Sequence, residues 1–319
     1  DQYFGLAIDI GSTTIALHLT DMNSGDVLAS VGCMNPQIRF GEDLMSRVSY
    51  LQMHPEGTVE MTEVVRDAIN HLIDEAAEVA DIDKRHILSM VAAGNPIMHH
   101  LVLGIDPSPL GFAPFTLATD DAIEIAAREV DLQINPGGRL YLPPCIAGHV
   151  GADTAAVLLS EQPYKGDSLS LIIDIGTNAE IVLGNQQKLL ACSSPTGPAF
   201  EGAQISCGQR AAPGAIERVR IDPETLDVRV RVIGSEFWSD EPGFTDSIVN
   251  FGITGICGSG IIEAVAEMYL AGVLSTDGVI QATRQSECDR ILSDGRTFSF
   301  LLTDGDVKVS VTQNDVRQI

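Results

Sequence analysis

The feature that most constrains the fold of this chain is an internal repeat. Residues 4–31 read FGLAIDIGSTTIALHLTDMNSGDVLASV, and residues 169–193 read LSLIIDIGTNAEIVLGNQQKLLACS. In each copy an apolar run ends in Asp-Ile-Gly, a hydroxyl-bearing residue leads into a second β-rich run, and a third run follows a turn. The pattern predicts the same three-stranded meander twice, so we expect two related lobes.

Helical patterns follow each predicted meander. Residues 61–80 carry apolar side chains at the i, i+3, i+4, i+7 spacing of an amphipathic helix. Strands followed by helices, twice over, indicate an α/β protein. A cluster of turn residues near 162–167 divides a first lobe, residues 1–165, from a second lobe, residues 166–319. The other expected elements are strands at 87–93, 216–221 and 226–233 and helices that begin after Pro96, open at 151–159 and span 261–274.

The repeated Asp-Ile-Gly turn has the residue types of a phosphate and magnesium site. Asp9 and Asp174 each end a predicted buried strand, and glycine and then a hydroxyl residue follow. Glycine allows close backbone approach, the amides and hydroxyls of the turn donate to phosphate oxygens, and the carboxylate holds Mg²⁺, usually through water. One copy alone is more typical of a hairpin turn that Asp merely shapes. Two matched copies favour a polyphosphate held from both sides.

Other nucleotide and metal motifs are missing from the sequence. Gly11 leads into a second strand instead of a helix, so the turn is not a dinucleotide fingerprint, and no P-loop is present. The six cysteines lack zinc or iron–sulfur spacing, which predicts reduced, mostly buried thiols; a redox role stays open for Cys257 in its glycine-rich segment. His99 and His100 are adjacent, and His149 lies near an acid but without further ligands, so we expect no zinc.

The charge balance excludes one class of partner. The chain carries 44 acidic and 19 basic residues, a net charge of −25, whereas nucleic-acid binding requires a basic surplus. Without an apolar run of ~20 residues or a signal-peptide layout, we expect no membrane partner and a cytoplasmic location. In so acidic a chain, a bound nucleotide would be neutralised by Mg²⁺, backbone amides and helix starts, so we expect a cleft poor in Lys and Arg.

Longer motifs carry a resemblance to a known family. The pair AIDIGSTT and IIDIGTNAE resembles the phosphate-1 and phosphate-2 motifs of the superfamily of acetate and sugar kinases, heat-shock chaperones and actin. Narrower stretches resemble the ATPase domain of the reductive activators of corrinoid proteins. They are NPQIRFGEDLMSRV (35–48), AAGNPIMHHLVLGIDPSPLGFAPF (92–115), LPPCIAGHVGADTAAVLL (142–159), TGPAFEGAQISCGQRAAPGAIE (196–217) and GICGSGIIEAVAEMYLAGVL (255–274).

The resemblance implies a fold and an activity. The fold would be a two-lobed actin-like, ribonuclease-H-like ATPase with a nucleotide cleft between the lobes. ATP and Mg²⁺ would be bound, and hydrolysis would be coupled to returning an inactive cobalt(II) corrinoid to cobalt(I). The implied partners are a corrinoid protein of a methyl-transfer system and an iron–sulfur electron-donor domain. A homodimer is left open.

This sequence departs from the family pattern in two ways. It contains no ferredoxin-type cysteine set, so the iron–sulfur cluster is expected only in a domain outside this chain. It also stops before the Gly-Gly-containing adenosine loop that superfamily members usually have, which predicts a second lobe truncated at its C-terminus.

The resemblance also assigns site residues. Asp9, Asp153 and Asp174 are the catalytic candidates, with Mg²⁺ on Asp9 and Asp174, most simply through water. The nucleotide-binding candidates are Gly11, Ser12, Thr13 and Thr14 in the first turn, Gly176, Thr177 and Asn178 in the second, and Gly197, Gly255, Gly258, Ser259 and Gly260 in two later small-residue loops.

Several of these residues have structural alternatives. Asp153 lies near the start of a helix, where capping is as good an explanation as catalysis. Glu180 points to the same side of its strand as Asn178 and is a candidate for the metal shell. The Gly258 segment is also typical of a turn and helix cap. Asn95 fits either a cleft residue or a Gly-Asn-Pro turn, and Trp238 fits either a partner contact or an anchored surface loop.

Two other functions are compatible with the same motifs. A small-molecule kinase would use Asp153 as the base that deprotonates an acceptor hydroxyl. A non-catalytic, nucleotide-gated interaction module would bind ATP without turnover.

Overall fold

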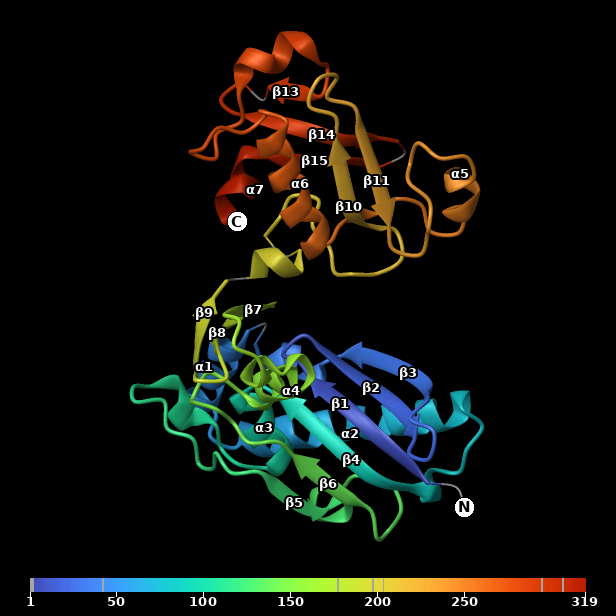
Figure 1. Cartoon of the computed structure of the whole chain (residues 1–319), viewed down its shortest axis with the longest axis vertical. Coiled ribbons are helices and arrows are strands. Elements are labelled where there is room, and N and C mark those ends of the chain that lie inside the picture. The colour runs from blue at the N-terminus through green and yellow to red at the C-terminus, as the bar shows by residue number, and fades with distance from the viewer. Residues whose placement is uncertain are drawn as a thin grey trace. The chain divides into compact units, whose positions relative to one another are not determined.

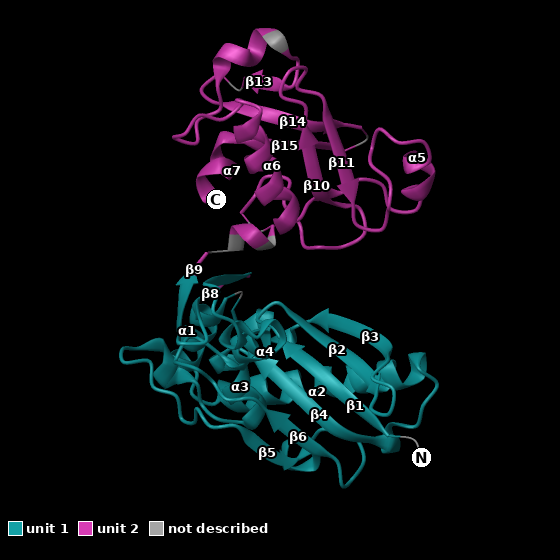
Figure 2. Ribbon diagram, in the orientation of Figure 1, with its two compact units in different colours: residues 1–174, 180–194 teal, residues 175–179, 195–319 magenta. Residues whose placement is uncertain are grey.

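The two units of the chain are each compact. The computed structural model describes residues 3–41, 43–176, 178–196, 198–202, 204–293, 295–305 and 307–319. Unit 1 comprises residues 1–174 and 180–194, and unit 2 comprises residues 175–179 and 195–319 (Figure 2). Most of the second repeat is therefore assigned to unit 1 by its contacts.

Both predicted meanders are confirmed (Figure 1). The first forms three strands of a larger sheet, and the second forms a three-stranded sheet of its own in the order β7-β8-β9. The six strands are β1 (Phe4–Ile10), β2 (Thr14–Asp21), β3 (Val27–Met34), β7 (Ser170–Ile175), β8 (Asn178–Asn185) and β9 (Lys188–Pro195).

The main sheet of unit 1 has six strands in the order β3-β2-β1-β4-β6-β5. The added strands are β4 (Ile87–Gly94), β5 (Ile123–Ala126) and β6 (Arg139–Leu142). β1 pairs with β4 in parallel, and Ile10 lies beside Gly94 at the carboxyl ends of the two strands. Parallel pairing requires a crossover connection, which the helices after β3 supply. The turn after β1 and the start of the helix α3 (Pro96–Leu103) therefore lie at one edge of the sheet.

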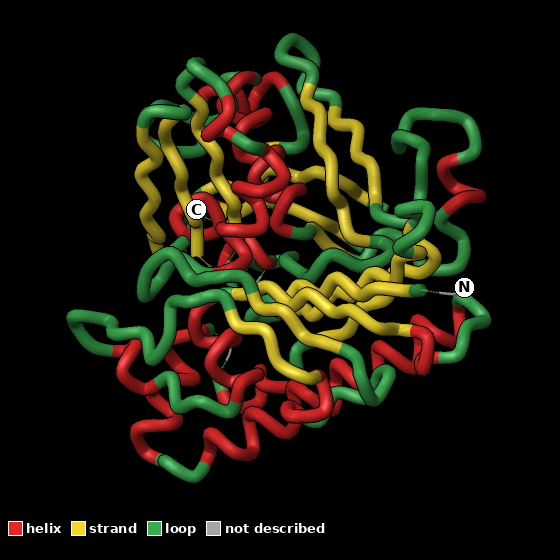
Figure 3. Tube along the Cα trace, turned by 60° about the horizontal axis from the view of Figure 1, so that its bottom comes forward, coloured by secondary structure: helices red, strands yellow, loops and turns green. Residues whose placement is uncertain are grey.

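Helices of unit 1 lie mainly along one face of this sheet, as Figure 3 shows. The predicted helix at 61–80 is confirmed as α2 (Gly57–Val79), and its apolar stripe, including Met61, Val65 and Ile69, is fully buried. At about 25 cal/mol per Å² of buried apolar surface, such a stripe is the main force that holds a helix to its sheet. The other helices are α1 (Leu44–Met53), α3 (Pro96–Leu103) and α4 (Ala152–Glu161).

Unit 2 has a separate core built on two three-stranded sheets, β11-β10-β12 and β13-β14-β15. The strands predicted at 216–221 and 226–233 are confirmed as β10 and β11, and the predicted helix at 261–274 begins three residues earlier, as α6. The elements are β10 (Ala215–Ile221), β11 (Val228–Val232), β12 (Gly255–Ile256), β13 (Ile291–Ser293), β14 (Phe298–Asp304), β15 (Lys308–Thr312), α5 (Phe244–Ser247), α6 (Gly258–Leu270) and α7 (Gln313–Gln318).

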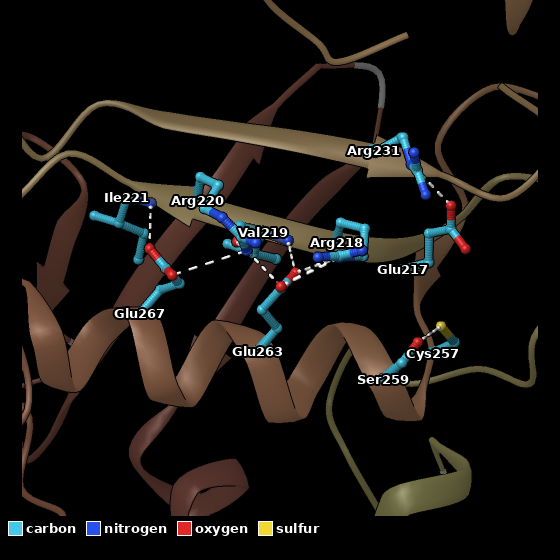
Figure 4. A network of polar contacts seen from close by, with 10 residues as sticks. All are labelled: Glu217, Arg218, Val219, Arg220, Ile221, Arg231, Cys257, Ser259, Glu263 and Glu267. Carbon is cyan, nitrogen blue, oxygen red and sulfur yellow. Dashed lines mark hydrogen bonds and ion pairs between the residues drawn. The ribbon is translucent and has the colours of Figure 1, made fainter. Parts of the chain in front are cut away.

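Two glutamates of α6 satisfy the backbone along one edge of β10 (Figure 4). The amide of Val219 donates to Glu263 Oε2 at 2.6 Å, and that of Ile221 donates to Glu267 Oε2 at 3.0 Å. Burial would raise the pKa of Glu263, but hydrogen bonds from Arg220, the Val219 amide and Arg218 outweigh it, so the pKa lies below its ordinary value. These carboxylates replace a neighbouring strand that β10 lacks at this point.

Replacing Glu263 is therefore expected to loosen unit 2. Glu263→Ala removes the acceptor of the Val219 amide and of two arginines, which we expect to cost about 1–3 kcal/mol. Hydrogen exchange should show faster exchange at Val219 and unchanged exchange in β4 of unit 1. Glu263→Gln, which keeps one acceptor oxygen, should lose less. Unchanged protection at Val219 in the alanine variant would contradict this role.

Candidate functional site

The first Asp-Ile-Gly turn connects β1 to β2. The Gly11 amide donates to the Thr14 carbonyl at 3.0 Å, and a Cβ on Gly11 would lie 2.7 Å from that oxygen, so only glycine fits. Asp9 is solvent-accessible, yet partial burial and then the nearby Asp174 raise the pKa of its carboxyl. Thus a reachable carboxylate with a raised pKa lies beside a turn whose backbone is tightly fixed.

Close backbone packing brings the start of α4 to the same edge of the sheet. A Cβ on Gly94 would lie 2.8 Å from the Ile10 carbonyl oxygen. A Cβ on Gly151 would lie 2.6 Å from both the Gly94 carbonyl oxygen and the Asn95 Cα. Side chains at these positions would force the strand ends and the helix apart. The two glycines thereby place Asp153, in the first turn of α4, close to the end of β1.

Asp153 has the most strongly shifted carboxyl of this region. Burial, and to a lesser extent the charges of Glu180, Asp9 and Asp174, raise its pKa to about 6; a hydrogen bond from the Thr154 amide, 2.7 Å from Oδ1, opposes the shift. The N-cap residue of α4 is Gly151, which has no side chain, and Asp153 Oδ1 accepts the first-turn amide of Thr154. This contact supports the capping explanation of Asp153, and its catalytic role stays a prediction.

Glu180 and Asp174 complete a group of four interacting carboxylates, which we call the acid cluster (Asp9, Asp153, Asp174 and Glu180). Burial and then Asp174 raise the pKa of Glu180, although the Ser193 hydroxyl donates to its Oε1 at 3.0 Å. The four residues come from β1, α4, β7 and β8. All lie in unit 1. Mutual repulsion of this kind is relieved by a bound cation.

The donor set fits magnesium that keeps its water shell. Carboxylate oxygens are the hard ligands that Mg²⁺ prefers, and Mg²⁺ usually retains several waters. In the parts of the chain that the structure describes, no three His, Cys, Asp or Glu side chains are grouped closely enough to hold a metal directly. Contact through water, as expected for Asp9 and Asp174, suits both observations.

The second turn is only partly described. The Gly176 amide donates to the Asn178 carbonyl at 2.8 Å, and the Thr196 hydroxyl donates to the Gly176 carbonyl at 2.6 Å. Two predicted site residues, Thr177 and Gly197, lie outside the described residues. Within the described residues, the hydrogen bond from Thr196 therefore connects the loop after β9 to the second turn.

The glycine-rich segment before α6 has a clear packing role in unit 2. A Cβ on Gly260 would lie 2.2 Å from the Ile216 carbonyl oxygen, and one on Gly255 would lie 2.6 Å from that of Cys207. Cys257 is buried, and its thiol donates to the Ile216 carbonyl at 3.2 Å and lies 3.3 Å from the Ser259 hydroxyl (Figure 4). The glycines let α6 approach β10. Nucleotide contact by Gly255, Gly258, Ser259 and Gly260 stays a prediction.

Several single residues that the sequence left open now have structural roles. The Asn95 carboxamide oxygen accepts the Ile97 and Met98 amides, both at 3.0 Å, and thus caps α3. The ring of Trp238 lies 4.9 Å from the Arg229 guanidinium and 5.7 Å from that of Arg220, which anchors its loop on β10 and β11.

The neighbouring histidines lie in the interior of unit 1. His100 is held on both sides, since its Nδ1 lies 2.7 Å from the Pro96 carbonyl oxygen and its Nε2 accepts the Ala118 amide at 3.0 Å. Burial, and to a lesser extent His100, lower the pKa of His99 to about 4. Both are therefore neutral near pH 7. The His149 ring packs against Phe115 at 4.5 Å.

Two polar residues that the motif analysis did not single out also contact the first turn. Asn35 and Arg47 are fully buried and hydrogen bond to the carbonyls of Gly11 and Ser12. The sequence does hold a signal for Arg47, because it stands with Leu44, Val48 and Leu51 on the buried side of α1. A charged residue on an apolar helix face indicates a buried polar partner.

Protein-family comparisons match both halves of the chain. A profile described as "RACo middle region" matches residues 4–165, and one described as "C-terminal domain of RACo the ASKHA domain" matches residues 168–319. The chain belongs to the RACo family of reductive activators of corrinoid proteins. The fold class is accordingly the α/β fold of the actin-like ATPases, as expected.

Named relatives agree with the family assignment. The "Corrinoid activation enzyme RamQ" of Eubacterium limosum is 33% identical over 99% of this chain and 52% of its own length. The "[Co(II) methylated amine-specific corrinoid protein] reductase" of Methanosarcina barkeri is 26% identical over 85% of this chain and 52% of its own. A solved "Reductive activator for corrinoid,iron-sulfur protein" is 36% identical with a TM-score of 0.82, covering 99% of this chain and 49% of the other.

The chain of this RACo family member spans about half the length of the relatives it matches. Among the described residues, no helix combines the length and apolar character needed to cross a membrane.

The raised pKa of Asp153 predicts a pH-dependent stability. Between about pH 4 and 6 the folded chain binds more protons than the unfolded chain, so the free energy of unfolding falls as the pH rises through that window. Asp153→Asn removes this contribution and is expected to stabilise the metal-free chain at pH 7 by about 1–3 kcal/mol.

Thermal unfolding from pH 4 to 8 without Mg²⁺ checks this prediction. Asp74→Asn is the matched control, because Asp74 pairs with Lys84 on the surface of unit 1 and lies outside the acid cluster. A parallel pH profile for Asp153→Asn and the wild type would contradict the assignment.

Proposed function

We propose that this chain is the ATP-binding and ATP-hydrolysing part of a reductive activator that returns an inactive cobalt(II) corrinoid protein to cobalt(I). The family assignment and the names of the relatives support the corrinoid role. The observation that carries the ATPase role is the acid cluster, in which Asp9 and Asp153 have raised pKa values beside a glycine turn of the phosphate type.

In this proposal the turns and the acids have distinct tasks. The backbone and hydroxyls of residues 11–14 and 176–178 contact the phosphates, and Asp9 and Asp174 hold hydrated Mg²⁺. The cation would neutralise phosphate charge, which the acidic chain itself does not do. Asp153, with a pKa of about 6, is mostly ionised near pH 7 and accepts a proton from the attacking water. Its Oδ1 is kept in place by the Thr154 amide.

The electron needed for the cobalt step comes from elsewhere. Converting cobalt(II) to cobalt(I) consumes one electron, and an iron–sulfur domain outside this chain would donate it. ATP binding and hydrolysis would shift the activator between two conformations that differ in affinity for the corrinoid protein. The free energy of this shift cannot exceed the difference in nucleotide-binding free energy between the two conformations. The reaction partners are a corrinoid protein and this donor, in the cytoplasm.

Removal of a magnesium-binding carboxylate tests the nucleotide site. Asp9→Asn and Asp174→Asn are each expected to weaken Mg-ATP binding at least tenfold, because a charge-assisted contact to hydrated Mg²⁺ is lost from each. Isothermal titration of the full-length protein measures this change, with Asp74→Asn as the matched surface control. Affinities within twofold of the wild type in both variants would refute the site.

Asp153 distinguishes hydrolysis from binding. Asp153→Asn is expected to keep Mg-ATP affinity within a few-fold and to lower phosphate release by about 10²–10⁴-fold, since only the proton acceptor is lost. Phosphate release with and without a cobalt(II) corrinoid protein measures hydrolysis. The absorbance of cobalt(I) in the same samples measures the reduction of the corrinoid. A phosphorylated small molecule in place of free phosphate would favour the kinase. Nucleotide binding without any turnover would favour the interaction module.

A further inference from the structure

The inner side of the first phosphate turn contains polar groups that the proposed function does not use. Three consecutive carbonyl groups, those of Gly11, Ser12 and Thr13, all accept hydrogen bonds from Asn35 or Arg47. Both of these residues are 0% exposed. A hairpin turn needs no such support, because its ends are already joined by β1 and β2 pairing.

Asn35 holds two of the three carbonyls. Its side-chain Nδ2 donates to the Gly11 carbonyl at 2.8 Å, and its backbone amide donates to the Thr13 carbonyl at 2.8 Å. The carboxamide oxygen is occupied as well, since it accepts the Gln37 amide at 3.0 Å and caps the short 3₁₀ helix Pro36–Phe40. The orientation of the Asn35 carboxamide is thereby fixed, with its NH₂ group toward the turn.

Arg47 holds the middle carbonyl. Its Nη2 donates to the Ser12 carbonyl, while its Nε donates to the Gly41 carbonyl at 3.0 Å. The planar guanidinium therefore joins the turn to the segment that precedes α1. A lysine at this position has a single ammonium group and cannot reproduce the two-ended contact.

Holding the carbonyls fixes the direction of the amides. A trans peptide is planar, so the N–H of each residue points opposite to the carbonyl of the residue before it. The carbonyls of Gly11 and Ser12 point toward Asn35 and Arg47, and the amides of Ser12 and Thr13 therefore point the other way. Successive amides that point in one direction form a concave anion-binding surface.

We propose that Asn35 and Arg47 are positioning residues that hold the Ser12 and Thr13 amides toward the phosphates of the bound nucleotide. This inference rests on the proposed function, because it assigns the phosphate group to the same turn. It adds two buried residues that touch neither nucleotide nor metal. Without the hydrogen bonds from these side chains, the peptide planes of the turn could rotate and the amides would lose their common direction.

Two variants separate positioning from stability. Asn35→Asp keeps the size of the side chain and the cap on Gln37 but replaces the donor to Gly11 with an acceptor. Arg47→Lys keeps the charge but loses one end of the contact. We expect each variant to weaken Mg-ATP binding by the full-length protein at least fivefold. The affinity of every protein is measured at the same number of degrees below its own melting temperature.

Arg66→Lys is the matched control. Arg66 is a partly buried arginine of unit 1 that, like the fully buried Arg47, donates from Nε to a backbone carbonyl. Its acceptor is the Val102 carbonyl at 2.9 Å, and it pairs with Asp131. Because Val102 is in α3 and away from the turn, Arg66→Lys is expected to change the melting temperature without changing the Mg-ATP affinity beyond twofold.

The amide resonances of Ser12 and Thr13 give the readout that a purely structural role would not move. In the wild type, Mg-ATP should shift both amide protons downfield, and in Asn35→Asp the shift should fall by at least half. Failure of the wild type to bind Mg-ATP would overturn the proposed function and this inference together. Wild-type binding with unchanged affinity and amide shifts in Asn35→Asp would overturn this inference alone. A loss in Arg66→Lys equal to that in Arg47→Lys would also overturn it.

Discussion

The candidate site depends on the close backbone contact at the carboxyl ends of β1 and β4. Parallel pairing sets Ile10 beside Gly94, and Gly151 lies against that strand end with no room for a side chain. This contact brings a hairpin turn and a helix start, which are far apart in the sequence, to one edge of the sheet. Any Cβ at the two glycines would open that edge and separate Asp9 from Asp153.

The acid cluster follows from this packing. Burial and the charges of neighbouring carboxylates from separate elements make Asp9, Asp153 and Glu180 harder to ionise, so their pKa values are raised. A protein gains no stability from such an arrangement on its own, because like charges in a partly dry environment repel. The arrangement is useful when a cation and a polyphosphate occupy it, which links the cost in stability to the proposed ATPase role.

The sequence indicated much of the fold because the periodic patterns are strong. The α2 stripe, the two meanders and the strands β10 and β11 could all be read from alternation or helical spacing. The sheet β13-β14-β15 was not predicted, since β13 and β15 are short and turn residues separate the three strands. The helical spacing of Arg47 with Leu44, Val48 and Leu51 indicates its burial, but only packing reveals that its partners are backbone carbonyls.

By itself, the sequence determined the repeated Asp-Ile-Gly turn, the helical and strand periods, and a family whose motifs run through both halves. These are local properties, set by residue type and spacing. The tertiary structure decided which carboxylates interact, that Asn95 caps a helix, that Gly260 serves packing, and that Asn35 and Arg47 hydrogen bond to the first turn. Those outcomes depend on distances between residues remote in sequence, which arise only when the strands pair and the helices pack.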